Sequence, residues 1–282
     1  MTATSGPVVY VVFPAWNEER VIGPTLRALA EAVRGNEGGY HVVLVDDGST
    51  DHTVAEAEKA VAESGGRLPL TVLRHEVNSG LGAGLRTGIY WCLDHARDQD
   101  VVVTLDADNT HPPALIPALV GQLGDRYDLA IASRYRQGSS VQGVPGYRLM
   151  LSDLGRLVFA SLFPIPGVRD YTCCFRAYRV PLLRRARQAW GDGLCTARGF
   201  EAVMDLLLKL RPLGVRAVEM GVPLDYGERV GQSKMKVLRT IRTTLLLLAR
   251  RFFERFTVAA PSRVRARIAA AERAVASGRA SD

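Results

Sequence analysis

The stretch VVVTLDADNTHPP (residues 101–113) joins a short apolar run to a cluster of acidic residues and then to two prolines. Residues 101–105 are apolar or β-branched throughout, which is typical of a strand buried on both faces of a parallel sheet. Pro112 and Pro113 stand where the first turn of a helix tolerates proline, so we expect a helix over about 112–123. A strand that runs into a polar turn and then into a helix is the repeating unit of an α/β fold.

The same unit recurs on both sides of this stretch. The predicted strands are 8–13, 41–45, 70–73, 101–105 and 129–132, and the helices between them are 19–34, 53–63, 83–96 and 112–123. Strands that alternate with helices predict a doubly wound α/β domain with a mostly parallel sheet. The later pattern is less regular, with a Gly-rich loop over 138–146, helices over 148–162 and 199–210, and a strand near 215–220.

Acidic residues follow several of these strands at the edge where ligands of an open parallel sheet bind. Glu18 and Glu19 follow the first strand, residues 46–47 (both Asp) follow the second, and Asp106 and Asp108 follow the fourth. Carboxylates gathered at one edge repel one another unless a cation lies among them. If the chain turns between Asp106 and Asp108, the pair could reach Mg²⁺ or Mn²⁺. Ordinary turn chemistry is the alternative, above all for residues 46–47 alone.

Four glycines after the third strand, Gly80, Gly82, Gly84 and Gly88, resemble a dinucleotide-binding fingerprint only superficially. That fingerprint belongs in the first strand-to-helix turn, which here contains no glycine. Close packing of a helix on the sheet explains the cluster better, so the sequence does not support a dinucleotide-dependent dehydrogenase.

The composition excludes several classes of protein. The chain has 282 residues, of which 47% are hydrophobic and 23% charged, as in globular proteins with a real core. No uninterrupted apolar run comes near the ~20 residues that a membrane-spanning helix needs. The first residues carry no basic side chain and lead into a strand, so we expect no secretory signal. Four cysteines without CxxC spacing argue against a zinc site and a disulfide framework, which favours a reduced, cytoplasmic protein.

The positive charge is concentrated at the C-terminal end. Residues 229–282 hold 13 Lys or Arg against three acids, a net charge of +10. The whole chain has a net charge of +7, so residues 1–228 carry −3. Residues 234–256 predict a basic amphipathic helix, which either lies in a membrane interface or packs on the domain. Its expected apolar face is Val237, Leu238, Ile241, Leu245, Leu248 and Phe252. The Ala/Arg-rich tail 257–282 is either a weak helix or disordered, and no base-stacking motif indicates nucleic acid.

Five motifs occur in one order: PAWNEE (14–19), VDDGSTD (45–51), NSGLGAGLRTG (78–88), LDADNTHPP (105–113) and ASRY (132–135). Together they resemble the family 2 glycosyltransferases with the GT-A fold, and within that family the dolichol-phosphate or polyprenyl-phosphate mannose synthases. The similarity continues through RDYTCCFRAYR (169–179) and VPLDYGERVGQSK (222–234), and so reaches about residue 240. The resemblance implies a GT-A catalytic domain over residues 1–233, followed by the helical segment 234–256.

The resemblance also implies roles for the residues that follow the first two strands. Pro14, Trp16 and Glu18 would hold the base and ribose of a nucleotide sugar, with Trp16 as a stacking surface in place of the family's usual Tyr. Val45 and Asp47 would complete this pocket.

The fourth strand would supply the metal site and α-helical residues further on would meet the acceptor. Asp106, Ala107 and Asp108 match the DxD motif, which in the resemblance binds Mg²⁺ or Mn²⁺, most directly through Asp108. Arg148 and Ser152 would contact the phosphate of the acceptor.

Three cations would contact the diphosphate of the donor. These are Arg134, Arg229 and Lys234, which would neutralise charge as the sugar leaves. With Asp106 and Asp108, Arg229 and Lys234 form the expected catalytic set. One residue is missing between Arg229 and Gly231 relative to the common pattern, so their geometry is expected to differ.

Other departures concern the metal and acceptor sides. Thr110 stands where the family often has Gln as a further metal ligand, and Arg156 stands where Asn is frequent. Cys173 and Cys174 replace small residues, and we expect them to be buried small hydrophobes.

The implied reaction is a single inverting displacement that transfers a sugar, mannose by preference, from GDP-mannose or a UDP-sugar to a polyprenyl or dolichyl phosphate. Such a phosphate is already ionised and needs no general base. A hydroxyl acceptor would need one, and Asp170 or Asp205 would be the candidates. The protein is then expected to be cytoplasmic or peripheral on the cytoplasmic membrane face. A soluble acceptor and a non-catalytic nucleotide-sugar-binding subunit are the alternatives.

Overall fold

A seven-stranded sheet forms the centre of the computed structural model, which describes residues 6–36, 39–65, 68–108, 110–143, 146–225, 237–256 and 266. The strand order is β3-β2-β1-β4-β7-β5-β8. Its strands are β1 (Val9–Ala15), β2 (Tyr40–Asp46), β3 (Leu70–Arg74), β4 (Val101–Thr104), β5 (Leu129–Ser133), β7 (Arg176–Arg179) and β8 (Ala217–Gly221). Neighbours pair in parallel except β7, which is antiparallel to both β4 and β5.

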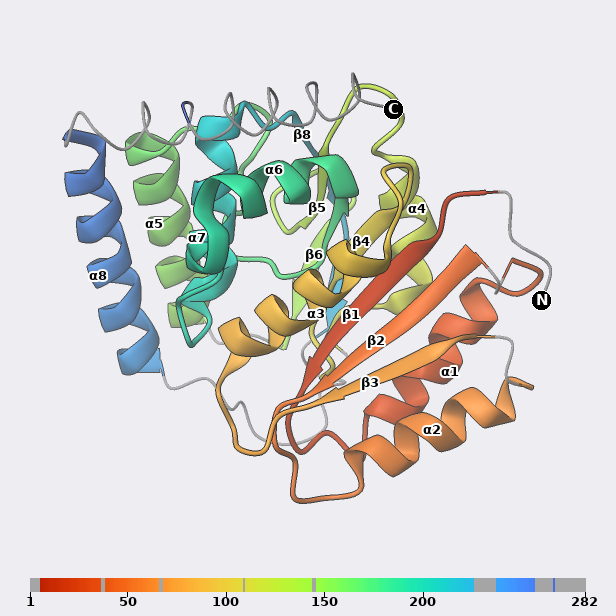
Figure 1. Ribbon diagram of the computed structural model, residues 1–282. Coiled ribbons are helices and arrows are strands. Elements are labelled where there is room, and N and C mark those ends of the chain that lie inside the picture. The colour runs from red at the N-terminus through yellow and green to blue at the C-terminus, as the bar shows by residue number, and fades with distance from the viewer. Residues whose placement is uncertain are drawn as a thin grey trace.

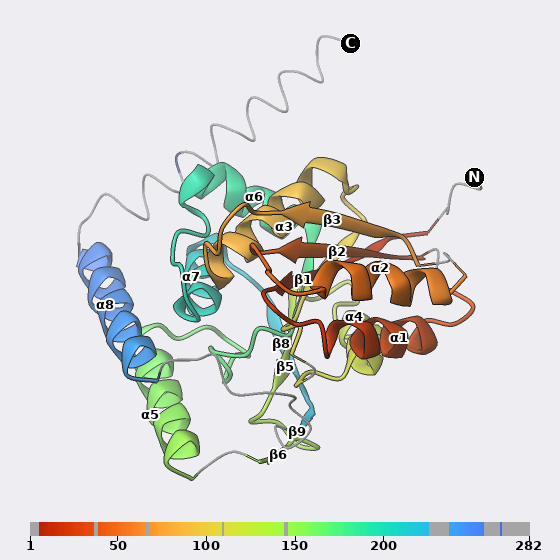
Figure 2. The same ribbon diagram turned by 90° about the horizontal axis from the view of Figure 1, so that it is seen from below.

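Helices cover both faces of this sheet (Figures 1 and 2). Seen from below, α1 (Ile22–Ala32), α2 (Thr53–Glu63) and α4 (Ile116–Gly121) lie on one face, and α3 (Leu81–His95) and α6 (Val180–Trp190) on the other. Helix α7 (Glu201–Leu210) packs against α3 and α6. Helices α5 (Gly146–Leu162) and α8 (Val237–Phe256) are neighbours at one side of the molecule in both views.

Short elements complete the chain. Strands β6 (Ser140–Gln142) and β9 (Pro223–Asp225) form a small parallel sheet, so the segment expected to be a Gly-rich loop contains a strand and the start of α5. Three 3₁₀ turns follow β4, α6 and α7, at Pro113–Leu115, Gly191–Gly193 and Arg211–Leu213.

The five strands predicted in the first half are confirmed, but β7 and α6 were not predicted. Strand β7 has only four residues and two of them are arginines. Arg176 is fully buried there because its guanidinium donates to the carbonyl oxygens of Val203 and Tyr171, each at 2.8 Å. A buried arginine hides the apolar signature from which buried strands are recognised.

The glycines after β3 pack α3 onto the sheet, as predicted. A Cβ on Gly82 would lie 1.6 Å from the carbonyl oxygen of Ala197, and one on Gly88 would lie 2.4 Å from Cγ1 of Val12. Distances this short leave room only for hydrogen, so these positions are fixed by packing and not by a bound dinucleotide.

Helix α8 is attached to α7 by a buried ion triad. Asp205 accepts hydrogen bonds from Nζ of Lys209 at 2.5 Å and from Nε of Arg251 at 2.9 Å. Lys209 also donates to the carbonyl oxygen of Leu194 at 3.0 Å, which satisfies its ammonium group away from water. The charged side chains of the triad are buried together with the surface of α8 that faces the domain.

Only part of the expected apolar face of α8 packs on the domain. The side that packs on the domain contains Leu247, Leu248 and Arg251, whereas Leu245 is 60% exposed. The pairing of Arg251 with buried Asp205 rotates the helix so that Leu245 faces outward. Residues 234–236 lie outside the described part of the chain, as does the tail 257–282 apart from residue 266. Among the described helices, none has both the length and the apolar character to cross a membrane.

Candidate active site

The loop after β1 forms one wall of the candidate site. Asn17 lies in the left-handed region with φ 54°, and its Oδ1 accepts the backbone N–H of Thr50 at 2.8 Å. The N–H of Glu18 donates to Oγ1 of Thr53 at 2.8 Å, which ties this loop to the one between β2 and α2. Trp16 is 39% exposed, so the loop presents part of an indole at the carboxyl edge of the sheet.

Asp47 orders the loop that leads into α3. Its buried carboxylate accepts hydrogen bonds from Nδ1 of His75 at 2.7 Å and from the backbone N–H groups of Ser79 at 2.9 Å and Gly80 at 2.7 Å. A carboxylate close to the start of a helix is also favoured by the helix dipole. Asp47 therefore has a structural role in addition to the base-binding role that the resemblance implies.

Pro14 and Val45 face each other in register at the ends of β1 and β2. Both lie under α3, where a Cβ on Gly84 would be 2.9 Å from Cβ of Pro14, and one on Gly88 would be 3.1 Å from Cγ2 of Val45. The side chain of Val45 is completely buried, so a ligand could reach this residue only through its backbone.

The turn between Asp106 and Asp108 that the metal hypothesis requires is present. Strand β4 ends at Thr104, and the chain bends at residues 107–108. Oδ1 of Asp108 accepts the N–H of Thr110 at 3.2 Å and its hydroxyl at 2.6 Å. Thr110 thus orients the carboxylate of Asp108, while Ala107 is buried beneath the turn.

His111 stabilises the same turn as a neutral side chain. Burial lowers its pKa to about 4, against the opposing effect of the Asp108 charge. Nδ1 of His111 accepts the backbone N–H of Asp106 at 3.5 Å, so the 3.7 Å separation from Oδ2 of Asp106 is not an ion pair. Nε2 lies 3.6 Å from the thiol of Cys173 and so links this turn to the segment 170–174, which forms part of the wall on the side of β5 and β8.

The two carboxylates after β4 suit a hard divalent cation. Within the described residues no three His, Cys, Asp or Glu side chains are grouped to hold a metal ion. Mg²⁺ commonly binds through one or two carboxylates and completes its shell with substrate phosphates and water. Asp106 and Asp108 fit that pattern, because the chain supplies two oxygen ligands and a bound diphosphate could supply more.

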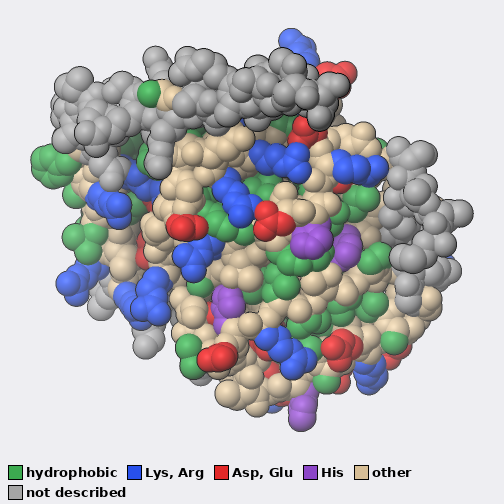
Figure 3. Space-filling model, viewed as in Figure 1, with side chains coloured by type: hydrophobic (Ala, Val, Ile, Leu, Met, Phe, Trp, Pro, Cys, Tyr) green, Lys and Arg blue, Asp and Glu red, His purple; other side chains and the backbone are tan. Residues whose placement is uncertain are grey.

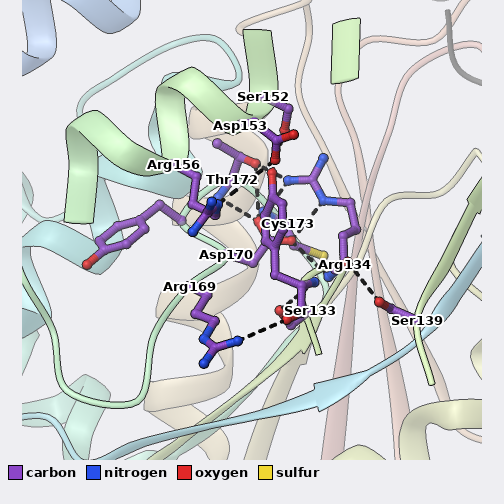
Figure 4. Close-up of polar contacts among 12 residues, drawn as sticks. Ser133, Arg134, Ser139, Ser152, Asp153, Arg156, Arg169, Asp170, Thr172 and Cys173 are labelled. Carbon is purple, nitrogen blue, oxygen red and sulfur yellow. Dashed lines mark hydrogen bonds and ion pairs between the residues drawn. The ribbon is translucent and has the colours of Figure 1, made fainter. Parts of the chain in front are cut away.

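Arg134, which follows β5, is paired with Asp170, and the two form the wall of the site on the side of β5 and β8 (Figure 4). Its Nε donates to Oδ2 and its Nη2 to Oδ1, both at 2.8 Å, and Nη2 also contacts Oγ1 of Thr172. Burial alone would raise the pKa of Asp170, but the Arg134 charge and the hydrogen bonds outweigh it and lower the pKa to about 2. Asp170 is therefore a very weak base at neutral pH.

Glu219 on β8 holds the backbone of the segment that contains Asp170. Its Oε1 accepts the backbone N–H groups of Arg169 and Asp170, both at 2.6 Å, and its Oε2 accepts Nε of Arg136 at 2.9 Å. The side chain of Glu219 is fully buried. Glu219 thus fixes the position of Asp170, and through it the guanidinium of Arg134.

Helix α5 adds the expected acceptor residues. Oγ of Ser152 and the hydroxyl of Tyr135 are hydrogen bonded at 3.0 Å, so Ser152 lies beside the residue that follows Arg134. Arg148 belongs to the same helix, but its side chain lies outside the described part of the structure. Arg229 and Lys234 lie outside it entirely, so the expected diphosphate clamp is represented by Arg134 alone.

The cysteines of the opposite wall are buried, as expected. Cys173 and Cys174 are 5% and 4% exposed, and both are free thiols. Burial raises the pKa of Cys173 to about 12, so this thiol stays protonated at neutral pH. The sequence did not predict Glu219 as a site residue, because a lone Glu in a strand shows no motif.

This sheet, with carboxylates at its carboxyl edge and an arginine-containing wall beyond β5, is the architecture of a GT-A-like glycosyltransferase. Residues 10–186 match the family model described as Glycosyl transferase family 2, and the chain belongs to this family and is a glycosyltransferase.

Several curated proteins are similar over most of the chain. Dolichol-phosphate mannosyltransferase of Pyrococcus furiosus is 30% identical over 81% of this chain and 59% of its own length, so the chain spans less than two thirds of that relative. Polyprenol monophosphomannose synthase of Mycolicibacterium smegmatis is 31% identical over 80% of each protein. Undecaprenyl-phosphate mannosyltransferase of Micrococcus luteus is 32% identical over 80% of this chain and 87% of its own.

Solved structures share the fold. Glucosyl-3-phosphoglycerate synthase from Mycobacterium tuberculosis, crystallised with Mn²⁺, UDP-glucose and phosphoglyceric acid, superposes with a TM-score of 0.60 at 23% identity. The match covers 88% of this chain and 80% of that one. At this identity the likeness establishes the architecture.

Proposed function

We propose that the protein transfers a sugar, mannose by preference, from a nucleotide sugar to a polyprenyl phosphate, with inversion and with the help of Mg²⁺ or Mn²⁺. The names of the relatives that are 30–32% identical support the lipid phosphate acceptor. One structural observation carries the proposal further: Asp170, the carboxylate nearest Arg134, is fully engaged and strongly acidic. A phosphate acceptor is compatible with such a site because it attacks as an anion.

Asp205, the other candidate general base for a hydroxyl acceptor, is also held by charged partners. Asp205 is buried in the ion triad with Lys209 and Arg251, between α7 and α8. A hydroxyl acceptor would require a carboxylate able to take up a proton near neutral pH. Asp170 does not meet this requirement, and the carboxylate of Asp205 is already engaged by Lys209 and Arg251, which favours the phosphate acceptor over a soluble alcohol.

The residues of the site divide into three proposed roles. Asp106 and Asp108 would hold the divalent cation, which when bound neutralises charge on the departing nucleoside diphosphate. Arg134, whose guanidinium is positioned by Asp170, would contact the diphosphate of the donor. Trp16 would stack on the base.

Two helices give this enzyme a surface suited to a lipid bilayer. Met150, Leu154 and Leu157 on α5 and Ile241, Leu245, Leu246 and Phe253 on α8 are all exposed, Phe253 by 69%. Figure 3 shows Lys and Arg side chains on the same side of the molecule. We propose that this side rests on the anionic face of a membrane, with apolar side chains among the acyl chains and basic ones at the head groups.

The reaction is tested with labelled GDP-mannose, polyprenyl phosphate and Mg²⁺ or Mn²⁺, by counting label in the organic extract. We expect labelled lipid that is lost when EDTA is added. Label from a UDP-sugar alone would change the donor and keep the mechanism. An extract without label for any donor would exclude the lipid acceptor.

Membrane contact is tested separately by sedimentation with vesicles that contain anionic lipid. We expect the double variant L245N/F253N to bind vesicles at least tenfold more weakly, since two large apolar groups leave the interface. V77N is the control, because Val77 is 69% exposed in the loop after β3, away from α8. Equal binding by L245N/F253N and the wild type would contradict the proposed surface.

A further inference from the structure

Tyr135 lies between two arginines at the acceptor side of the site. The guanidinium carbon of Arg134 is 5.6 Å from the centre of its ring, and that of Arg156 is 5.0 Å away. Ser152, one helical turn before Arg156 on α5, is hydrogen bonded to the Tyr135 hydroxyl. Figure 4 shows Ser152 and Arg156 reaching from α5 toward the loop that carries Thr172. Arg156 therefore lies among the residues expected to meet the acceptor.

The two arginines differ in how their charges are matched. Arg134 is bidentate to buried Asp170, so its charge is largely balanced. Arg156 makes no hydrogen bond to any described residue, and its buried Nε has no partner. It forms a long ion pair with Oδ1 of Asp153, 3.9 Å from its Nε and beyond hydrogen-bonding distance, and the Asp153 side chain is 57% exposed.

A buried guanidinium N–H without a partner is costly. Among the described residues this applies to Nε of Arg156 and of Arg176, and of these two side chains only that of Arg156 is partly exposed. The Arg156 side chain as a whole is 31% exposed, so we expect a ligand to reach it beyond the buried Nε. A cation–π contact with the Tyr135 ring, 5.0 Å from the guanidinium carbon, restrains the position of the guanidinium. A planar fork held in this way matches two oxygens of a phosphate group.

We propose that Arg156 binds the phosphate group of the acceptor together with Ser152 and determines the preference for a doubly charged phosphate monoester. A monoester carries about −1.5 to −2 charges at neutral pH. Because Asp170 already balances Arg134, Arg156 supplies a further positive charge for this group, beside the one expected from Arg148. The identity of the acceptor rests on the proposed function, but the recognition of a phosphate monoester does not.

Equilibrium binding tests this assignment without requiring turnover. The ligands are farnesyl phosphate as a lipid phosphate, glycerol phosphate as a soluble one, and farnesol as the uncharged control. We expect R156N to weaken farnesyl phosphate binding at least tenfold and R156K to weaken it less, because lysine keeps the charge but loses the fork. R187N is the matched control, since Arg187 stacks on Tyr90 at 4.7 Å far from the site, and it should bind like the wild type.

Each outcome decides the inference. Equal affinity of the wild type and R156N for both phosphates overturns it, as does a wild type that binds neither. An equal loss for farnesol shows that Arg156 acts through packing, and also overturns it. A loss for glycerol phosphate alone keeps the inference and removes the lipid acceptor from the proposed function. If R156N does not fold, R156K must still weaken phosphate binding for the inference to stand.

Discussion

The two walls of the site use the same kind of residue in opposite ways. On the side of β1, β2 and β4, carboxylates accept backbone N–H and hydroxyl groups from nearby turns, as Asp108 does from Thr110. On the side of β5 and β8, Asp170 and Glu219 are buried and each is paired with an arginine. The described contacts of the Asp108 carboxylate are with neutral donors, whereas Asp170 and Glu219 are held by arginines. We therefore assign the proposed metal to the first wall and the proposed anionic acceptor to the second.

Breaking the arginine pair should have the largest effect on the fold. We expect R134M to lower the free energy of unfolding by about 3 kcal/mol or more, because removing one partner strands the buried charge of Asp170. Urea unfolding measures this change. R187M is the control, because Arg187 and its partner Asp94 are both partly exposed, and we expect it to lower the free energy of unfolding by less than about 1 kcal/mol. The double variant R134M/D170N should recover part of the loss. A stability of R134M equal to the wild type would show that the second wall does not depend on this pair.

Removing charge from the first wall should affect activity and leave the fold intact. We expect D108N to lower sugar transfer at least about 100-fold, because a cation contributes several kcal/mol of charge stabilisation in such reactions. Asn can still accept from Thr110, so the free energy of unfolding should stay within about 0.5 kcal/mol of the wild type. D98N, at an exposed surface aspartate, is the control. Full activity in D108N would remove the metal role from the first wall.

The helices behind the two walls should tolerate a methyl group differently. We expect G82A in α3 to destabilise the protein by about 1–3 kcal/mol, because the new Cβ would meet the Ala197 carbonyl. G155A in α5 meets nothing within 4 Å and should stabilise by about 0.5–1 kcal/mol. Thermal melting of the pair compares them directly. Equal melting temperatures would contradict the close approach of α3.

The smallest expected effect is a pH dependence that belongs to the second wall. The pKa of Asp170 is lowered from 3.8 to about 2, so its ionised form stabilises the fold above the unfolded-state pKa and this contribution is lost as the pH falls. The contribution is about 2 kcal/mol near neutral pH, and about half of it should be gone by pH 3. Urea unfolding from pH 5 to pH 3 should show the difference between wild type and D170N narrowing by about 1 kcal/mol. A constant difference would place the stabilisation elsewhere.

The sequence predicted the first wall better than the second, for a physical reason. The strands before Trp16, Asp47 and Asp106 are continuous apolar runs, and their polar residues follow immediately, so local pattern was sufficient. The partners of the second wall are far apart in the chain: Arg134 meets Asp170, and Arg136 meets Glu219. Pairings of this kind depend on which strands become neighbours, which local pattern does not encode.

The position of α8 shows the same limit. Its amphipathic pattern predicted a helix, and the helix is present from Val237 to Phe256. Which side of the helix packs on the domain was left open by the sequence, because the helix is oriented by Arg251 and Asp205 and not by its apolar residues alone. The roles of Arg229 and Lys234 remain predictions from the resemblance.

The antiparallel strand β7 has a consequence for the order in which the protein is assembled on the ribosome. Strands β1 to β4 can join as soon as they are made, since they are neighbours in the sheet. Strand β5 emerges next but does not touch β4, and its partners β7 and β8 begin about 40 and 80 residues after it ends. At roughly 5–20 residues per second, β5 waits several seconds with both edges unpaired. The nascent chain is therefore most exposed to misassociation and to chaperone capture while residues 134–175 are being synthesised.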